Sequence, residues 1–227
     1  MNELNIKFRD KYGEFERYIK EKYDVNYLSD DVFDNEALKD KKILWKQSRA
    51  LRNILSHNGG MDFANITPEK LEEFCNAVDK IMHPKKAIEI AIKESNIYKV
   101  KSDESVLNVI NTMINNNFTC TPIVNDDNKI IGVFSDHSLL LYTSKNPEIM
   151  EDFSQVSIKD IMEYCSLESS SEIEYKFVSK DTKEDELKLM FKNSYDERKR
   201  LEAIFITHSG KQTEKLLGML TLWDMQN

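Results

Sequence analysis

Apolar residues recur three or four positions apart through the first third of the chain, the spacing that places them on one face of an α-helix. The first stripe of this kind contains Leu4, Phe8, Tyr12, Phe15, Ile19 and Tyr23. A second pattern follows Asp34, a residue type that caps helices, and stops at the consecutive Gly59 and Gly60. The spacing predicts two amphipathic helices in this part of the chain.

Two further helical stretches follow. Thr67 and Pro68 place a capping residue and then a proline at the start of a third helix. Pro84 breaks or kinks this helix, and a fourth stretch continues to about Ser95. Three or four amphipathic helices with short connections predict a small all-α bundle over residues 1–95.

The pattern changes at Tyr98, where short runs rich in β-branched and aromatic residues begin. These runs alternate with helical segments and are IYKV, CTPIV, KIIGVF, YKFV, EAIFIT and KLLGML. They contain a weak internal repeat, because NKIIGVFSDHSLL aligns with EKLLGMLTLWDMQ at one offset. The alignment pairs Gly132 with Gly218 and Ser135 with Thr221. Each copy is predicted to run strand, helix, strand, strand, helix, so the predicted fold class is α+β.

Residues 96–227 resemble a tandem pair of CBS domains. The resemblance is carried by TPIVNDDNKIIGVFSDHSLL, by the linker VSIKDIM and by LLGMLTLWD. It implies a first CBS repeat with its linker at 96–164 and a second at 165–227, each of βαββα order, packed as a pair through their sheets. It also implies adenine-nucleotide-type ligands in the clefts and a sensor role toward an attached effector.

The ligand motif of this family is a glycine, two hydrophobic residues, a hydroxyl residue, two further residues and an aspartate. The second repeat holds it complete, from Gly218 to Asp224 with Thr221 as the hydroxyl. A hydroxyl beside free N–H groups of a helix N-terminus suits phosphate, and a carboxylate accepts from both ribose hydroxyls. Ser138 replaces the aspartate in the first repeat, so one occupied site is expected. Further contacts are expected from Val178, Ser179 and Ile204.

The same junctions have a second interpretation. Thr-x-x-Asp is close to a capping box, in which two side chains satisfy the backbone N–H groups that begin a helix. No ligand is needed in that case, and Ser135 and Thr221 only begin helices. The sequence leaves both interpretations open.

The helix that ends in LRNILSHNGG has two unlike faces. At about 100° per residue, one face collects Lys42, Lys46, Arg49, Arg52, Asn53 and His57. The opposite face is apolar and contains Ile43, Leu44, Leu51, Ile54 and Leu55. Asn53 and His57 lie one turn apart, so their side chains can touch. The polar face is a second candidate site.

The string Arg52-Asn53-x-x-x-His57 resembles the signature of the HEPN superfamily, covering about residues 1–90. HEPN proteins are small helical bundles, usually dimeric, and many are metal-independent ribonucleases. The resemblance implies that His57 moves a proton, Arg52 grips the phosphate and Asn53 orients the imidazole. The alternative is a solvated face in a scaffold, where cations near the helix C-terminus interact with the helix dipole.

Charge and cysteine content narrow the function classes. The net charge is −8, with 16 Lys+Arg against 17 Asp+Glu in residues 1–90 and 16 against 23 in the rest. An acidic C-terminal part repels nucleic acid, so any RNA contact is expected in the N-terminal part. The cysteines lack metal or redox spacing, and no metal-ligand set is visible. A charged N-terminus and the lack of an apolar run of about 20 residues predict a cytoplasmic protein without a membrane span.

These patterns together predict a two-part sensor. The C-terminal repeats are expected to bind AMP, ADP, ATP or a related adenosine compound, with no cofactor required, and to regulate the N-terminal bundle. The bundle is expected to be either a metal-independent ribonuclease acting on RNA or a non-catalytic regulator or scaffold that docks a partner. A homodimer is expected because the bundle is small for an independent core and both resembled families usually pair.

Overall fold

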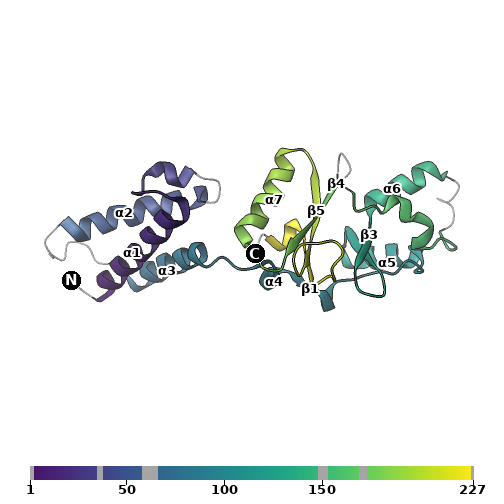
Figure 1. Cartoon of the computed structure of the whole chain (residues 1–227), viewed down its shortest axis with the longest axis horizontal. Helices are drawn as coiled ribbons and strands as arrows, with labels where there is room; N and C mark the ends of the chain where they lie inside the picture. Colours follow the sequence, from purple (N-terminus) through teal and green to yellow (C-terminus); the bar gives the residue numbers. More distant parts are fainter. Residues whose placement is uncertain (1–2, 35–37, 58–65, 148–152, 169–172, 226–227) are drawn as a thin grey trace. The chain divides into compact units, whose positions relative to one another are not determined.

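The structure is a computed structural model, and it describes residues 3–34, 38–57, 66–147, 153–168 and 173–225 (Figure 1). The chain divides into two compact units, residues 1–85 and 86–227. The division falls earlier than the boundary predicted after residue 95, because the segment that follows Lys85 pairs and packs within the second unit. Each unit is built around hydrophobic clusters of its own.

The first unit is helical, as predicted, with α1 (Glu3–Tyr23), η1 (Asp30–Asp34), η2 (Lys39–Lys41), α2 (Lys42–His57) and α3 (Pro68–Met82). Thr67 caps α3, because its hydroxyl oxygen accepts a hydrogen bond from the Lys70 N–H at 3.3 Å. Asp34 does not begin the second helix. Its carboxylate accepts from Lys42 Nζ at 2.6 Å, and the residues up to Asp34 form a 3-10 turn. The second helix therefore begins later than its sequence pattern predicts.

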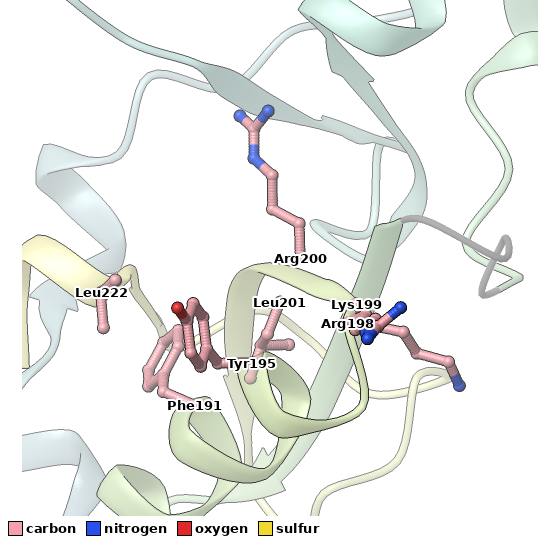
Figure 2. Close-up of a pocket in the computed structure, with 7 residues that line it drawn as sticks. All are labelled: Phe191, Tyr195, Arg198, Lys199, Arg200, Leu201 and Leu222. Atoms are coloured by element: carbon pink, nitrogen blue, oxygen red, sulfur yellow. The ribbon is translucent and has the colours of Figure 1, made fainter.

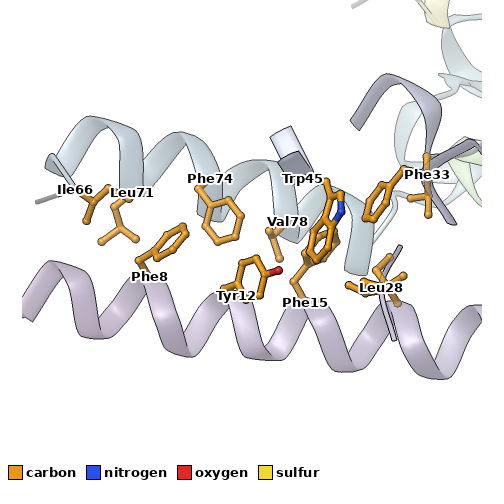
Figure 3. Close-up of a cluster of buried hydrophobic side chains, with 12 residues drawn as sticks. Phe8, Tyr12, Phe15, Leu28, Phe33, Trp45, Ile66, Leu71, Phe74 and Val78 are labelled. Atoms are coloured by element: carbon orange, nitrogen blue, oxygen red, sulfur yellow. The ribbon is translucent and has the colours of Figure 1, made fainter. Parts of the chain in front are cut away.

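The apolar stripe of α1 faces the core of the helical unit, as its spacing predicts (Figure 3). Trp45 of α2 is almost fully buried there. Its ring centroid lies 5.4 Å from that of Tyr12 and 4.9 Å from that of Phe33, with the rings stacked. Aromatic rings bury large apolar areas, so this cluster supplies much of the core of a small bundle.

The second unit contains the two predicted repeats, and its mixture of helices and sheets confirms the α+β class. The first repeat comprises α5 (Val106–Asn116), β2 (Cys120–Val124), β3 (Ile130–Ser135) and α6 (Asp136–Lys145). The second comprises β4 (Ile173–Ser179), α7 (Glu184–Asp196), β5 (Arg200–Thr207), β6 (Gly218–Leu220) and η6 (Leu222–Met225). The strand expected near Tyr98 is reduced to a single parallel β-bridge between Val100 and Ile123. This bridge occupies the position in the first repeat that β4, parallel to β5, occupies in the second.

A short segment precedes each repeat and packs against the other repeat. Before the first repeat lie α4 (Ala87–Ile90), β1 (Ile92–Lys93) and η3 (Glu94–Asn96). β1 pairs antiparallel with β6, and α4 shares a hydrophobic cluster with α7. Before the second repeat lies η5 (Ile158–Tyr164), which shares a cluster with α5 and α6. The predicted fourth helix is therefore wrong beyond Ile90, because the chain there extends to pair with β6.

Two glycines allow these entering segments to approach the strands of the other repeat. A Cβ atom on Gly132 would lie 2.8 Å from the backbone oxygen of Cys165, which follows η5. One on Gly218 would lie 3.0 Å from the Ala91 side chain and 3.1 Å from the Ile92 oxygen. The glycine that opens each aligned motif thus serves the contact between repeats, since a larger residue would displace the partner backbone.

The two repeats pack through their sheets, as the CBS resemblance implies. One sheet has the order β1–β6–β5–β4, with β4 parallel to β5, and the other is the β2–β3 hairpin. The apolar cluster that joins the two sheets contains Cys120, Val124, Ile130, Val133, Ala203, Phe205, Leu216 and Met219. At the hairpin tips, Leu216 N–H donates to the Asn128 oxygen at 2.9 Å. Helices pack on the outer sides of both sheets (Figure 1).

Candidate functional site

The β6–η6 junction, called here the carboxylate junction, holds the complete ligand motif. Thr221 donates to Asp224 Oδ2 from both its backbone N–H and its Oγ1, each at 2.7 Å. Both residues are half-buried. Among the described residues, no donor reaches Oδ1 of Asp224. One carboxylate oxygen therefore holds the turn, and the other is available to a ligand hydroxyl.

The β3–α6 junction, called here the serine junction, is the counterpart in the first repeat. Ser138 N–H donates to Ser135 Oγ at 3.3 Å, and Ser135 N–H donates to Ser138 Oγ at 2.7 Å. Both serines are buried. The capping box is thus complete in this junction without a carboxylate. Capping geometry is present at both junctions, and Asp224 is what distinguishes the second from the first.

Strand register separates the other expected contacts from the carboxylate junction. Ile204 pairs with Leu220, so its backbone lies beside the junction, but its side chain is fully buried in the core shared with α7. Val178 and Ser179 pair with the C-terminal end of β5. At about 3.3 Å per residue, Ser179 lies roughly 13 Å along the strands from the level of the junction. The structure therefore does not bring Val178 and Ser179 together with Asp224.

Two residues of the second repeat, Arg200 and Tyr175, reach the serine junction, and the sequence motifs did not identify them. Arg200 Nη2 lies 3.7 Å from Asp136 Oδ2, at the start of α6. The same guanidinium pairs with the buried Glu202, with Nε 2.5 Å from Oε2 and Nη2 donating to Oε1 at 3.0 Å. Burial raises the pKa of Tyr175, and a side-chain hydrogen bond with Ser135 opposes that rise. One feature of the sequence could have indicated Arg200 and Glu202: they alternate with apolar residues in a strand, so they lie on one face of the sheet, and charges buried there need partners.

A pocket of about 670 Å³ opens at the end of α7 (Figure 2). Its lining consists of Phe191, Tyr195, Arg198, Lys199, Arg200, Leu201 and Leu222. Figure 2 shows Phe191, Tyr195 and Leu222 close together on one side of the last turn of α7, with Arg198 and Lys199 on the other side. The pocket therefore combines an apolar wall with a cationic rim.

The polar face of α2 is paired with acidic residues of η1. Lys42 Nζ lies 2.6 Å from Asp34 Oδ1, and Lys46 Nζ lies 3.2 Å from Asp30 Oδ2. Arg49 Nη1 lies 3.8 Å from the other carboxylate oxygen of Asp30. These pairs are exposed and contribute little stability. They do reduce the positive charge that this face offers to a phosphate backbone.

The Arg-Asn-x-x-x-His string is placed only in part. Arg52 Nη1 donates to Asn53 Oδ1 at 3.1 Å, and the Arg52 guanidinium lies 5.8 Å from the ring centre of Tyr12. His57 is the last residue of α2, but its side chain lies outside the described residues. Of the three residues in the string, the structure shows Arg52 and Asn53 in contact.

The cysteine thiols and the possible metal ligands form no further candidate site among the residues that the structure describes. Cys120 and Cys165 are buried, and Cys75 is half-buried. Burial raises the pKa of all three thiols, to about 11 for Cys165. Within the described ranges, no cluster of three or more His, Cys, Asp or Glu residues is arranged to hold a metal ion. No described helix combines the length and apolar character needed to cross a bilayer.

Comparison with known proteins finds a family match over the first repeat. Residues 88–145 match the CBS domain family. The match begins within α4 and ends with α6, so it includes the entering segment and the serine junction. No curated protein sequence matches the chain.

Several solved structures are similar to this chain. CBSX2, a CBS-pair protein from Arabidopsis thaliana, in complex with AMP, is 17% identical over 62% of this chain and 92% of its own, with a TM-score of 0.44. CbpB in complex with c-di-AMP is 12% identical over 68% and 89%, with a TM-score of 0.47. The CBS domain pair of MJ0100 in complex with 5-methylthioadenosine and S-adenosyl-L-methionine is 15% identical over 63% and 93%, with a TM-score of 0.42.

Proposed function

We propose that residues 86–227 form a CBS pair that binds an adenosine-type ligand at the carboxylate junction and regulates the helical unit in response. The observation that carries this proposal is the half-buried Asp224, with Oδ2 fixed by Thr221 and Oδ1 facing no protein donor among the described residues. A carboxylate held in this way is positioned to accept from vicinal ribose hydroxyls without reorganising. The family match of the first repeat and the matching element order of the second support the same function.

Charge favours the carboxylate junction over the serine junction as the nucleotide site. At the serine junction, the Arg200 cation is shared between Glu202 and Asp136, so the local charge is already negative. A phosphate there would face two carboxylates and only one cation. The serine junction also lacks an acceptor equivalent to Asp224, because Ser138 and Ser135 satisfy each other. We therefore assign one nucleotide per chain.

Calorimetry with AMP on matched variants tests the site. Asp224→Ala should weaken binding by roughly ten- to a hundred-fold, because it removes a charge-assisted hydrogen bond worth about 1.5–3 kcal/mol. Ser138→Ala is the matched control, since it removes a capping side chain from the other junction without removing a carboxylate. If both variants bind AMP with wild-type affinity, the ligand does not bind at the carboxylate junction.

A thermal-shift series identifies the ligand. The series contains AMP, ADP, ATP, S-adenosylmethionine and c-di-AMP, each at the same excess. A ligand that binds the folded chain raises its apparent stability, by about 2.7 kcal/mol at a hundred times its Kd. If no compound raises the melting temperature, the sensor function is wrong for this chain.

For the helical unit we propose a non-catalytic role in dimerisation or partner docking. The pairing of Lys42, Lys46 and Arg49 with acidic residues of η1 supports this role over RNA binding. Light scattering across a dilution series should show a homodimer. The scattered cysteines suit a reducing compartment, so we place the protein in the cytoplasm.

The alternative function of the helical unit is a metal-independent ribonuclease, and one cleavage assay distinguishes it from the docking role. Wild type, Arg52→Ala and His57→Ala are incubated with single-stranded RNA in EDTA, with and without the best ligand. A proton-transfer residue contributes about 10²–10⁴-fold, so a nuclease would lose nearly all cleavage in His57→Ala. Cleavage with that mutant pattern would replace the docking role. An inactive wild type, or equal cleavage by all three proteins, would leave the docking role in place.

A further inference from the structure

Each entering segment is bonded to the strand that leads into one capped junction, and the two segments connect different parts of the chain. Residues 86–96, the first entering segment, continue directly from the helical unit into α4 and β1 (Figure 1). They pair with β6, which leads into the carboxylate junction. Residues 158–165, the second entering segment, join the two repeats and contact β3, which leads into the serine junction. The segment that reaches the helical unit is therefore bonded to the strand that carries the complete ligand motif.

β6 is a short strand that is held from both sides. It spans only Gly218–Leu220 and lies between β5 and β1 in the sheet. On the β1 side, Met219 pairs with Ile92. A strand of three residues makes few bonds to either neighbour, and a two-stranded pairing alone is marginally stable in water. Thr221 follows β6 directly, so release of β1 would loosen the strand that positions the carboxylate junction.

Leu217, the residue before β6, connects β5 to the first entering segment through its backbone. Its N–H donates to the Ile206 oxygen of β5 at 2.8 Å, and its oxygen accepts from the Glu94 N–H at 3.1 Å. At the next position, a Cβ atom on Gly218 would lie 3.1 Å from the Ile92 oxygen, so the glycine permits this close approach. The ligand motif thus begins in direct backbone contact with the first entering segment.

The start of the first entering segment is also bonded to the second repeat. Ala87 is fully buried, and its N–H donates to the Thr182 oxygen at 2.7 Å. The Ile88 N–H donates to the Lys180 oxygen at 3.2 Å. Both acceptors lie in the loop between β4 and α7. The helical unit ends at the residue before this segment, so order in the second repeat extends to the end of the helical unit.

The serine junction is held in a different way. β3 spans Ile130–Ser135 and pairs with β2 along most of its length. The second entering segment adds the bond from the Val133 N–H to the Cys165 oxygen at 3.0 Å. A ligand at this junction would act on the connection between the repeats, which does not lead to the helical unit. The complete motif therefore stands in the repeat whose strand is bonded to the connection between the units.

We propose that ligand binding at the carboxylate junction is transmitted to the helical unit through β6 and the first entering segment. This transmission rests on the nucleotide site proposed above and assigns its regulatory output to residues 86–96. The ligand binds only while β6 holds Thr221 and Asp224 in place, so it suppresses the openings that separate β1 from β6. Those openings lengthen the free connection between the two units. Ligand binding keeps the connection short, and loss of the ligand releases it.

Amide hydrogen exchange, followed by mass spectrometry on the full chain with and without AMP, tests the transmission. At an AMP concentration a hundred times its Kd, exchange in residues 86–96 should slow by up to about a hundred-fold, because each opening that loosens β6 must also release the ligand. Residues 216–225 should slow with them. Residues 158–165 should slow several-fold less, since they contact the other junction.

Two substitutions of Glu94 separate the backbone bond from the side chain. Glu94→Pro removes the N–H that donates to Leu217, and Glu94→Ala keeps it. Both remove the carboxylate that pairs with Lys99. Glu94 is the first residue of η3, and Lys93 before it is extended with a ψ of 146°, so proline fits this backbone. Circular dichroism should show that both variants keep the fold.

The two variants should differ both without and with the ligand. Without AMP, Glu94→Pro should exchange faster than Glu94→Ala in residues 216–225, because the coupling between two sites is reciprocal. With AMP, Glu94→Pro should lose most of the slowing in residues 86–96, whereas Glu94→Ala should keep it. Calorimetry on the same proteins shows whether AMP is bound.

The outcomes separate this transmission from the nucleotide site on which it rests. If AMP binds and slows exchange in residues 216–225 alone, the site stands and the transmission is wrong. Equal slowing in residues 86–96 and 158–165 would show that AMP stabilises the whole second unit evenly, which also overturns the transmission. Identical exchange in the two Glu94 variants would show that the backbone bond to Leu217 carries no coupling. If calorimetry detects no AMP binding, the nucleotide site falls first and the transmission falls with it.

Discussion

At the scale of single residues, Asp224 and Ser138 occupy equivalent positions in the two repeats. Both cap a turn, but their side chains differ in what else they can bind. Both side chains accept from the backbone N–H that begins a turn, at 2.7 Å in each case. A carboxylate has a second oxygen for a ligand after capping the turn, whereas the serine hydroxyl has donated to the Ser135 oxygen. The capping and binding interpretations of this motif are therefore compatible at Asp224.

Arg198 allows the cost of a strained backbone to be measured. Arg198→Asn should raise the free energy of unfolding of the second unit by about 0.5–1 kcal/mol, because asparagine tolerates a positive φ. For a unit of this size the melting temperature should rise by about 2–4 °C per kcal/mol. The reverse change in the other repeat, Asn117→Arg, should lower it. A melting temperature that falls in Arg198→Asn would show that the arginine side chain stabilises the fold.

Glu214 should make the β5–β6 loop sensitive to acid. Its carboxylate accepts from the backbone N–H and hydroxyl of Ser209, each at 2.7 Å, and these bonds lower its pKa from 4.5 to about 2. A carboxylate with a lowered pKa stabilises the fold above its unfolded pKa, and that contribution is lost as the pH falls from about 4.5 through 2. NMR titration of the side chain should give a midpoint near 2. In Glu214→Gln, unfolding should depend less steeply on pH across this window, and identical dependence would contradict the assignment.

At the scale of elements, the sequence predicted what is local and missed what depends on distant partners. The stripe of α1 and the Thr67 cap follow from spacing within one segment, and both are confirmed. The segment around Ile92 has helical spacing but forms β1, because β6 provides a backbone partner that no local pattern records. Long-range pairing overrides propensity in such short segments.

The candidate site shows the same limit. Thr221 and Asp224 are three residues apart, so a linear motif finds them, and the turn brings them together as expected. Val178 and Ser179 were assigned by analogy along the chain, and the register of β4 on β5 places them at the far end of the strands. Arg200 reaches the first repeat only through the packing of the two sheets. No spacing within one repeat can reveal a contact of that kind.

The motif glycines should be intolerant of a side chain. Gly132→Ala would bring a Cβ atom within 2.8 Å of a backbone oxygen, and Gly218→Ala would bring one within 3.0 Å of Ala91. Overpacking of this kind typically costs about 1–3 kcal/mol, so both variants should unfold at lower denaturant concentration.

Gly13 is the matched control for these two changes. It lies within α1, and a Cβ atom there would meet nothing within 4 Å. Gly13→Ala should therefore raise the free energy of unfolding by about 1 kcal/mol through helix propensity. If all three variants lose stability, or none does, the motif glycines are not required for close approach of the entering segments.

At the scale of the whole molecule, the division after Lys85 has consequences for which part of the chain folds alone. The second unit includes α4, whose Ala87 is fully buried, and β1, which covers the edge of β6. A unit cut at the predicted boundary would lose both elements. It would also leave the β6 edge unpaired, which favours aggregation.

Two fragments test this boundary. Residues 86–227 should fold with a cooperative thermal transition, because they contain all the clusters of the second unit. Residues 96–227 should lose a few kcal/mol, since Ile88 and Ile90 are partly buried and full burial of such a side chain contributes about 1.5–3 kcal/mol. Differential scanning calorimetry distinguishes them. Equal melting temperatures would show that the entering segment is dispensable.

Because the segment before the first repeat packs against the second repeat, the order of synthesis determines when this segment can be covered. β1 leaves the ribosome early, but its partner β6 is translated only near the end of the second repeat, on the order of ten seconds later at about ten residues per second. During that interval Ala87 and Ile92 have no strand or helix to cover them, because α7 and β6 do not yet exist. The segment before the first repeat therefore stays uncovered until the second repeat is nearly complete, so we expect chaperones to engage the nascent chain at residues 86–97 and release it once β6 has emerged.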